Sequence, residues 1–111
     1  MLKRIFRLRK KSNYKAVFAD GKNYSVKYVA IYVLVGPKRF GFIASKKVGN
    51  SVQRNRARRL MREVIRLHLP EIRNDRQIIF IARANIKGVS YAEVEKSIMS
   101  MLNKAKVLKI K

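Results

Sequence analysis

The stretch Lys46–Leu69, KKVGNSVQRNRARRLMREVIRLHL, decides how this 111-residue chain folds. If a helix begins at Ser51, a step of about 100° per residue gathers apolar side chains on one arc and arginines on another. The predicted apolar arc consists of Ala57, Leu60, Met61, Val64, Leu67 and His68. The predicted cationic arc consists of Arg54, Arg58, Arg59, Arg62 and Arg66, with Arg56 at its border. One face of the helix should therefore enter a core while the other presents arginines.

The start of this helix is an unusual place for cations. Asn50 is predicted to cap the helix, and Gln53 can complete a capping box with it. Arg54 and Arg56 then fall in the first two turns, where exposed cations oppose the helix dipole at a cost of roughly 0.3–1 kcal/mol each. Glu63 is the only acid between Ser51 and Pro70, so these arginines are not balanced along the helix. The pattern favours binding of phosphate groups over a merely solvated face.

The composition points in the same direction. The chain carries 28 Lys and Arg against 6 Asp and Glu, a net charge of +22, which is typical of proteins with a polyanionic partner. Apolar residues make up 48% of the chain, enough for one folded domain over residues 1–111. A membrane surface is the rival partner, but no basic helix has the apolar interfacial face that such binding uses. We therefore expect an RNA or DNA partner, no membrane partner and a cytoplasmic location.

The order of the predicted elements gives an α+β fold. A helix capped by Ser12 should end at Asp20-Gly21, and a strand is predicted over Val26–Val35. After a turn at Gly36-Pro37, a second strand over Arg39–Ser45 should pair back as a hairpin. The arginine-bearing helix, an apolar strand over Gln77–Ala84 and a helix capped by Ser90 and Glu93 complete the chain. We expect a two-layer sandwich in the order helix, strand hairpin, helix, strand, helix.

One face of the predicted sheet resembles a half-open groove. Val29, Ile31, Val33 and Val35 alternate along their strand with Tyr28, Ala30, Tyr32 and Leu34, so the aliphatic set should face the helices. Gly41 in the middle of the next strand predicts close approach of another group to the sheet. Tyr14 and Phe18 share a face of the first helix with Val17; we interpret Val17 as core and the two aromatics as candidate platforms for stacked bases.

The sequence lacks the residue patterns of a catalyst. The six acids lie in separated segments, which does not favour a paired-carboxylate or two-metal site. There is no cysteine, and the single histidine, His68, is interpreted as a core or helix-end residue. We expect no catalytic residue and assign no metal ligand in the protein itself, and the sequence leaves open whether the protein has a metal site of its own. Residues 1–11 form a basic arm for which the sequence specifies no structure, and partial disorder is compatible with its composition.

The arginine-bearing stretch also resembles the signature of the bacterial ribonuclease P protein subunit. The matching residues are Lys46-Lys47-Val48-Gly49, Val52 and Arg54-Asn55-Arg56-x-Arg58-Arg59-Leu60-Met61-Arg62. Tyr14-x-x-Val17-Phe18-x-x-Gly21 resembles the first helix of that family, and Ile79–Arg83 resembles its last strand. The resemblance extends over nearly the whole chain.

This resemblance implies a role that composition alone does not predict. Members of the family bind a catalytic RNA, which removes the 5′ leader of precursor tRNA using Mg²⁺. The resemblance assigns contact with that RNA to Arg54, Asn55, Arg56, Arg58, Arg59 and Arg62. It assigns the groove for the single-stranded leader to Tyr14, Phe18, Ala30, Tyr32, Lys46 and Lys47. It also implies a left-handed crossover from the second strand through the arginine-bearing helix to the last strand, against the usual right-handed rule.

Two other interpretations stay open from the residues alone. A structural RNA-binding protein, such as a ribosomal protein with a similar fold, would have the same charge and element order. An independent nuclease would need converging carboxylates, which the sequence does not offer. The ordered Arg-Asn-Arg signature favours the ribonuclease P protein over both.

Overall fold

The computed structural model describes residues 3–109 of the chain. Its strands are β1 (Lys22–Ser25), β2 (Val29–Val35), β3 (Arg39–Ala44) and β4 (Arg76–Ala82). Its α-helices are α1 (Lys11–Asp20), α2 (Ser51–His68) and α3 (Tyr91–Lys104). Short 3₁₀ turns lie at Arg4–Phe6, Lys46–Val48, Leu69–Glu71 and Ala84–Ile86. The α+β class and the order of the predicted elements are confirmed.

The four strands form one sheet in the order β1-β2-β4-β3. The predicted hairpin between Val26–Val35 and Arg39–Ser45 is wrong, because β4 lies between these strands, antiparallel to β2 and parallel to β3. The physical reason is the composition of β4, which is apolar on both faces and therefore suits the central position. The chain from β3 to β4 must then cross over through α2, in agreement with the crossover that the family resemblance implies.

Strand β1 was not expected from the sequence. Its four residues, KNYS, show no apolar alternation, yet they pair with β2 from Lys22↔Val33 to Ser25↔Ala30. The strand predicted from Val26 accordingly begins at Val29, because Val26 to Tyr28 form the connection between β1 and β2. The alternation along β2 is confirmed: Val29, Ile31 and Val33 are buried, while Val35 at its end is exposed.

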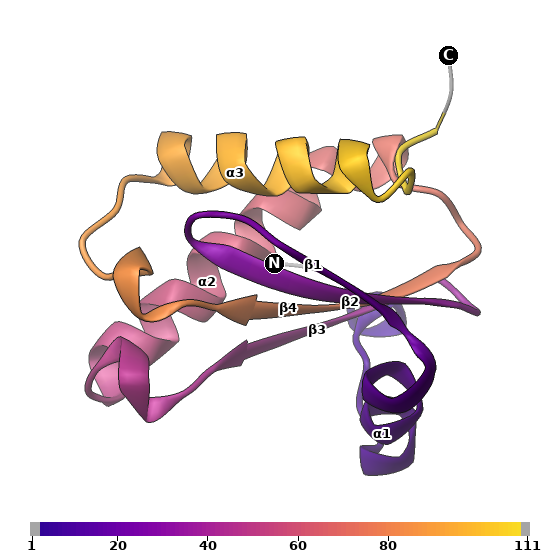
Figure 1. Cartoon of the computed structure of the whole chain (residues 1–111), viewed down its shortest axis with the longest axis horizontal. Coiled ribbons are helices and arrows are strands. Elements are labelled where there is room, and N and C mark those ends of the chain that lie inside the picture. Colours follow the sequence, from indigo (N-terminus) through magenta and orange to yellow (C-terminus); the bar gives the residue numbers. More distant parts are fainter. Residues whose placement is uncertain (1–2, 110–111) are drawn as a thin grey trace.

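The helices lie on both sides of the sheet (Figure 1), with α2 and α3 against one face and α1 against the other. The larger core joins the aliphatic face of β2 to the buried sides of α2 and α3. In α2 that side consists of Ala57, Met61, Val64 and Ile65. The prediction that Leu67 belongs to this side is wrong, since Leu67 is 51% exposed. The buried arc is centred closer to Met61, which brings Ile65 inside and leaves Leu67 outside.

The predicted caps are partly confirmed. Asn50 and Gln53 form the reciprocal capping box of α2, with both hydrogen bonds at 2.9 Å. Ser90 accepts a hydrogen bond from the Glu93 backbone, but the Glu93 side chain instead accepts one from Tyr28. The predicted Ser12 cap is wrong, because α1 already begins at Lys11 and has no side-chain cap. Gly21 follows this helix with a φ of −77°, so its role is close packing; a Cβ there would lie 2.4 Å from the Val17 carbonyl oxygen.

The basic arm is ordered along the outer edge of β3. Leu8 is buried, and its N–H donates to the Phe40 carbonyl at 2.8 Å beside a parallel bridge between Arg7 and Phe40. Arg39 also donates to the Ile5 carbonyl at 2.9 Å. The apolar residues interspersed in the arm thus anchor it, an outcome that composition did not predict. Residues 1 and 2 of the arm lie outside the described residues. Within residues 3–109, no helix has the length and apolar character needed to cross a bilayer.

Candidate nucleic-acid interface

Helix α2 presents its arginines at a fixed place because of the turn that precedes it. Ser45 accepts a hydrogen bond from the Lys47 backbone and starts the short turn Lys46–Val48. Gly49 then adopts a φ of 144°, which favours glycine, and a Cβ there would collide with the Gln53 side chain. These constraints fix where the capping box forms and hence which side chains enter the first turns.

Three of the predicted RNA-binding arginines donate hydrogen bonds within the protein that orient them. Arg56 donates to the Val89 carbonyl at 3.1 Å, and Arg58 donates to the Asn55 side chain. Arg54 donates to Ser51 at 3.2 Å, yet its Nε is buried with no hydrogen-bond partner, the only such side-chain atom among the described residues. A buried donor without a partner costs about 1–3 kcal/mol. The start of α2 is therefore not optimised for the stability of the free protein.

Arg62 lies close to several other cations, including Arg58 and Arg59 of α2. Its guanidinium lies 5.6 Å from the centre of the Phe42 ring, over the edge of β3. Desolvation lowers the pKa of Arg62, and the nearby charges of Arg7, Arg58 and Arg59 lower it further. Arg66, which the sequence placed on the same arc, is instead neutralised by an ion pair with Glu63. The unneutralised charge is thus gathered toward the β3 edge.

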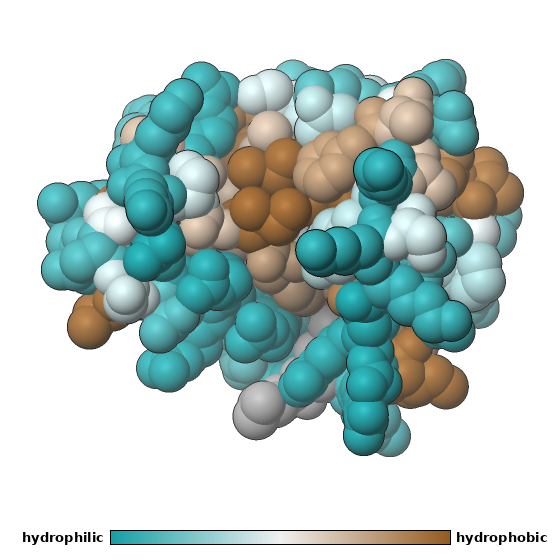
Figure 2. Space-filling view, turned by 90° about the horizontal axis from the view of Figure 1, so that it is seen from below, coloured by the Kyte–Doolittle hydropathy of each residue, from teal (hydrophilic) through white to brown (hydrophobic). Residues whose placement is uncertain are grey.

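The opposite face of the sheet carries a partly exposed apolar surface beside α1. Pairing of the strands places Ala30 of β2, Ile81 of β4 and Ile43 of β3 in one row, all partly exposed. The neighbouring row, Tyr32, Ile79 and Gly41, lies beneath α1. Figure 2 views the α1 side of the molecule and shows an apolar area bordered by hydrophilic side chains. We call the surface formed by Phe18, Ala30, Tyr32, Ile43 and Ile81 the cleft.

Phe18 and Tyr32 lie together in this cleft, as predicted. Their rings pack edge to face with centroids 4.9 Å apart, and Phe18 is 40% exposed. Phe18 therefore keeps an accessible ring surface that is already fixed by a neighbour. Lys46 and Lys47 are exposed just after β3 ends, beyond Ile43 along the strand.

Tyr14 differs from the predicted stacking platform. Its hydroxyl donates to the Leu8 carbonyl at 3.1 Å, and its ring packs on Gly41, the close approach that the mid-strand glycine predicted. Burial raises the pKa of the Tyr14 hydroxyl, while the Arg62 charge opposes that rise. Tyr14 thus attaches the arm and α1 to the sheet, and Phe18 is the more accessible aromatic of the two.

Sequence reasoning omitted two residues of the cleft floor and one cation. Ile81 belongs to a strand that is apolar on both faces, so alternation could not assign it to the cleft. Ile43 was not included among the groove residues, although it lies two residues after Gly41 and therefore on the same face of its strand. Arg7 lies near Arg62 only because the arm pairs with β3, for which the sequence carries no local signal.

The carboxylates are used to hold the protein together. Glu71 and Glu95 contact the two nitrogens of His68, and Asp75 pairs with Arg73 and Arg76. Among residues 3–109, no group of three or more His, Cys, Asp or Glu side chains is arranged to hold a metal ion.

Comparison with known proteins identifies relatives over almost the full length. Residues 2–106 match the family described as Ribonuclease P. The chain is 37% identical over 105 residues to the ribonuclease P protein component of Alkaliphilus metalliredigens, a match that covers 92% of this chain and 95% of that protein. It is 36% identical over 110 residues to the corresponding protein of Clostridium kluyveri, with 95% and 98% of the two chains covered.

Solved structures resemble the fold equally closely. The RNase P protein from Staphylococcus aureus superimposes with a TM-score of 0.82 at 29% identity, over 100% of this chain and 99% of that one. The RNase P protein from Thermotoga maritima superimposes with a TM-score of 0.80 over 88% of this chain and 96% of that one. Its identity of 23% supports the fold alone.

Proposed function

The chain belongs to the ribonuclease P protein family, and from this premise we propose that it is the protein subunit of a bacterial ribonuclease P. In this role it binds the catalytic RNA and the single-stranded 5′ leader of precursor tRNA, and it assists the removal of that leader in the cytoplasm. Family membership favours this function over that of a structural RNA-binding protein with a similar fold.

The observation that carries the proposal is the position of β3 between two different surfaces. Phe42 on one face of β3 contacts Arg62 of the cationic helix, whereas Ile43, the next residue, faces the cleft. The helix offers guanidinium groups suited to phosphates, and the cleft offers aromatic and aliphatic surface suited to unstacked bases. A leader in the cleft and a catalytic RNA on the arginines would therefore lie next to each other at β3.

We assign the two surfaces as follows. The catalytic RNA is bound by Arg54, Asn55, Arg56, Arg58, Arg59 and Arg62. The leader is bound by Phe18, Ala30 and Tyr32, with Ile43 and Ile81 as floor, Tyr14 as the residue that positions α1, and Lys46 and Lys47 at the rim.

We assign hydrolysis to the RNA and its Mg²⁺ ions. The carboxylates Glu63, Glu71, Asp75 and Glu95 are each engaged with a cationic or histidine side chain, which fits structural use and not metal binding. The protein would then act by holding the two RNAs in register, a positioning role that needs no catalytic side chain.

Affinity measurements test the proposal. The protein bound to a bacterial ribonuclease P RNA should bind precursor tRNA more tightly than mature tRNA, and the difference should disappear when the protein is omitted. Equal affinity for the two tRNAs in the presence of the protein would contradict the leader assignment.

A further inference from the structure

A second concentration of positive charge lies away from both the cleft and the start of α2. It comprises Lys22 of β1, Arg73 and Arg76 before and at the start of β4, and Lys104, Lys106 and Lys109 at the end of the chain. Two adjoining surface hollows share Arg73 and Lys106 and connect these residues. We call this set the C-terminal basic surface. It lies where α3 ends and β4 begins, whereas α2 begins at the opposite end of the sheet (Figure 1).

Residues 107–109 are held in place by contacts with residues 71–73. Val107 is fully buried, and its carbonyl accepts a hydrogen bond from the Arg73 backbone at 2.8 Å. The backbone N–H of Lys109 donates to the Glu71 carbonyl at 2.7 Å, and Leu108 forms an isolated antiparallel bridge with Ile72. The cations therefore project from a fixed backbone, which lowers the entropy lost when they bind a partner.

Lys106 occupies a position that would suit glycine better. Its φ is 57°, the only positive value for a non-glycine residue in the described chain. The N–H of Lys106 donates to the Asn103 carbonyl at 3.1 Å and that of Val107 to the Leu102 carbonyl at 3.2 Å, which together form a Schellman motif. Glycine is preferred at this position because a side chain is strained there. The sequence thus retains a charged side chain at a cost to folding.

The charges of this surface are only partly balanced. Asp75 forms ion pairs with Arg73 at 3.0 Å and with Arg76 at 2.9 Å. In the part of the chain that the structure describes, Lys106 and Lys109 have no ion pair. Burial lowers the pKa of Lys38, and the nearby charge of Lys109 lowers it further. Lys104 is in the last turn of α3, where the helix dipole accounts for a cation. Lys106 and Lys109 lie beyond the helix, so this explanation does not extend to them.

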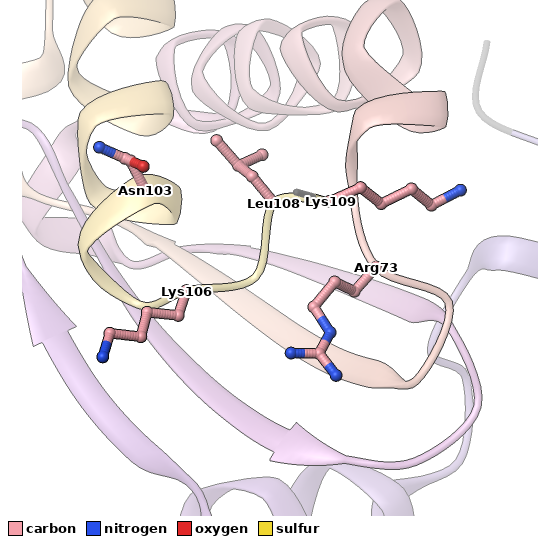
Figure 3. Close-up of a pocket in the computed structure, with 5 residues that line it drawn as sticks. All are labelled: Arg73, Asn103, Lys106, Leu108 and Lys109. Atoms are coloured by element: carbon pink, nitrogen blue, oxygen red, sulfur yellow. The ribbon is translucent and has the colours of Figure 1, made fainter. Parts of the chain in front are cut away.

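The shape of the surface suits an extended polyanion. Figure 3 shows Lys106 and Lys109 reaching in opposite directions, with the Arg73 guanidinium between them. The hollow in Figure 3 is lined by Arg73, Asn103, Lys106, Leu108 and Lys109 and has no aromatic ring on which a base could stack. The adjoining hollow also contains Tyr24 and Asp20. In the first hollow, separated cations without a stacking group can contact phosphates but not bases, which is how helical RNA is bound without regard to sequence.

We propose that the C-terminal basic surface binds the phosphodiester backbone of a helical RNA segment, as a second contact separate from the arginines of α2. This inference rests on the proposed function, because it takes the partner to be RNA. The protein would then bridge two RNA segments at opposite ends of its sheet. The segment belongs either to the catalytic RNA or to the precursor tRNA, which present the same backbone chemistry.

The test compares two variants of equal net charge. Lys106→Gln with Lys109→Gln removes two cations from the proposed surface, and Lys27→Gln with Lys96→Gln removes two exposed cations elsewhere. Binding to a bacterial ribonuclease P RNA is measured over a range of salt concentrations. The first variant should lower the slope of log K against log salt by about 2, and the control by much less. Equal changes in both variants would mean that only overall charge matters and would overturn the proposal.

Lys106→Gly separates binding from folding. Glycine relieves the strained backbone, so the melting temperature should rise while the salt slope falls by about 1. A higher melting temperature with unchanged RNA binding would overturn the proposal. If the wild-type protein does not bind the RNA, the proposed function fails. If the wild type binds the RNA and these variants bind it equally well, only this inference fails. If the variants at Lys106 and Lys109 lose binding to phosphatidylserine vesicles but bind RNA as the wild type does, the surface is assigned to a membrane instead.

The absence of cysteine allows the RNA segment to be mapped. An iron–EDTA group attached to Asn103→Cys should cut a helical segment different from the one cut from Val52→Cys on α2. Cuts present with the catalytic RNA alone identify that RNA as the source, and cuts that appear only with precursor tRNA identify the substrate. Cutting from position 52 with none from position 103 in either complex would contradict the proposal.

Discussion

The ring of Tyr14 lies directly on the backbone of Gly41. A Cβ at Gly41 would be 2.6 Å from the Tyr14 hydroxyl oxygen and 2.8 Å from the ring carbon that bears it. Because the same hydroxyl donates to Leu8, this one contact joins α1, the basic arm and β3. The position of α1, and with it the wall of the cleft, depends on the absence of a side chain at residue 41.

Gly41→Ala should therefore displace α1 and lower the free energy of unfolding. Overpacking of this kind costs typically 1–3 kcal/mol, and urea denaturation would measure it. Tyr14→Ala should relieve the clash, so the double variant should lose less stability than the sum of the two single variants. Strictly additive losses would show that the two residues do not determine each other's position.

Phe18→Ala should weaken binding of the leader with little effect on folding, since Phe18 is partly exposed. The expected loss is about 1–3 kcal/mol, the scale of one stacked base. Tyr32→Ala should give a similar loss. Both effects should appear with precursor tRNA and vanish with mature tRNA in holoenzyme binding assays. Leu67→Ala is the matched control, because Leu67 is exposed near the end of α2, on the other side of the sheet from the cleft. Equal losses with the two tRNAs would identify Phe18 and Tyr32 as structural residues.

A triple variant with Arg54→Gln, Arg58→Gln and Arg62→Gln should show a weaker salt dependence of binding to the catalytic RNA. Each lost phosphate contact lowers the slope by about 0.7–0.9, so the triple variant should lose roughly 2–3. Arg66→Gln serves as a control because Arg66 is already paired with Glu63. An unchanged slope in the triple variant would remove the basis for the phosphate contacts of α2.

His68 makes the stability of the protein depend on pH. The pKa of His68 is raised, first by its hydrogen bond to Glu95 and also by Glu71, although burial opposes the rise. The folded protein thus favours protonated His68, and this contribution is complete below the ordinary histidine pKa of about 6.5. It is lost as the pH rises through the raised value. The same pair lowers the pKa of Glu95, whose contribution is lost as the pH falls below its ordinary range near 4.3.

Urea denaturation at several pH values would measure this effect. The free energy of unfolding should fall between about pH 6.5 and alkaline pH in the wild type, and His68→Gln should remove that fall. The same fall in wild type and variant would show that another group causes it.

The sequence allowed the main elements to be predicted because their signals are local. The capping box of Asn50 and Gln53 marked the start of α2, and alternation assigned Val29, Ile31 and Val33 to the helix side of the sheet. The pairing of β3 could not be predicted in the same way. Which strand lies beside it depends on the crossover through α2, and the turn at Gly36-Pro37 alone resembled a hairpin connection.

The candidate site was predicted to a similar extent. Arg58, Arg59 and Arg62 do cluster, and Phe18 and Tyr32 do meet across α1 and β2, because helical and strand periodicity determine their directions. The packing of Tyr14 depends on Gly41, a residue 27 positions away in the chain, and the contribution of Arg7 depends on the docked arm. Gly41 did predict that a group approaches the sheet closely, but which residue approaches it is determined only in the folded chain.

Cleavage of precursor tRNA at low Mg²⁺ concentration is the most direct test of the central claim. A bacterial ribonuclease P RNA is assayed alone, the protein alone, and the two together. The account predicts correct removal of the 5′ leader only in the combined reaction. Cleavage by the protein alone would contradict the assignment of hydrolysis to the RNA. If the combined reaction cleaves no better than the RNA alone at low Mg²⁺, although the same RNA is active at high Mg²⁺, the protein is not the subunit of that RNA.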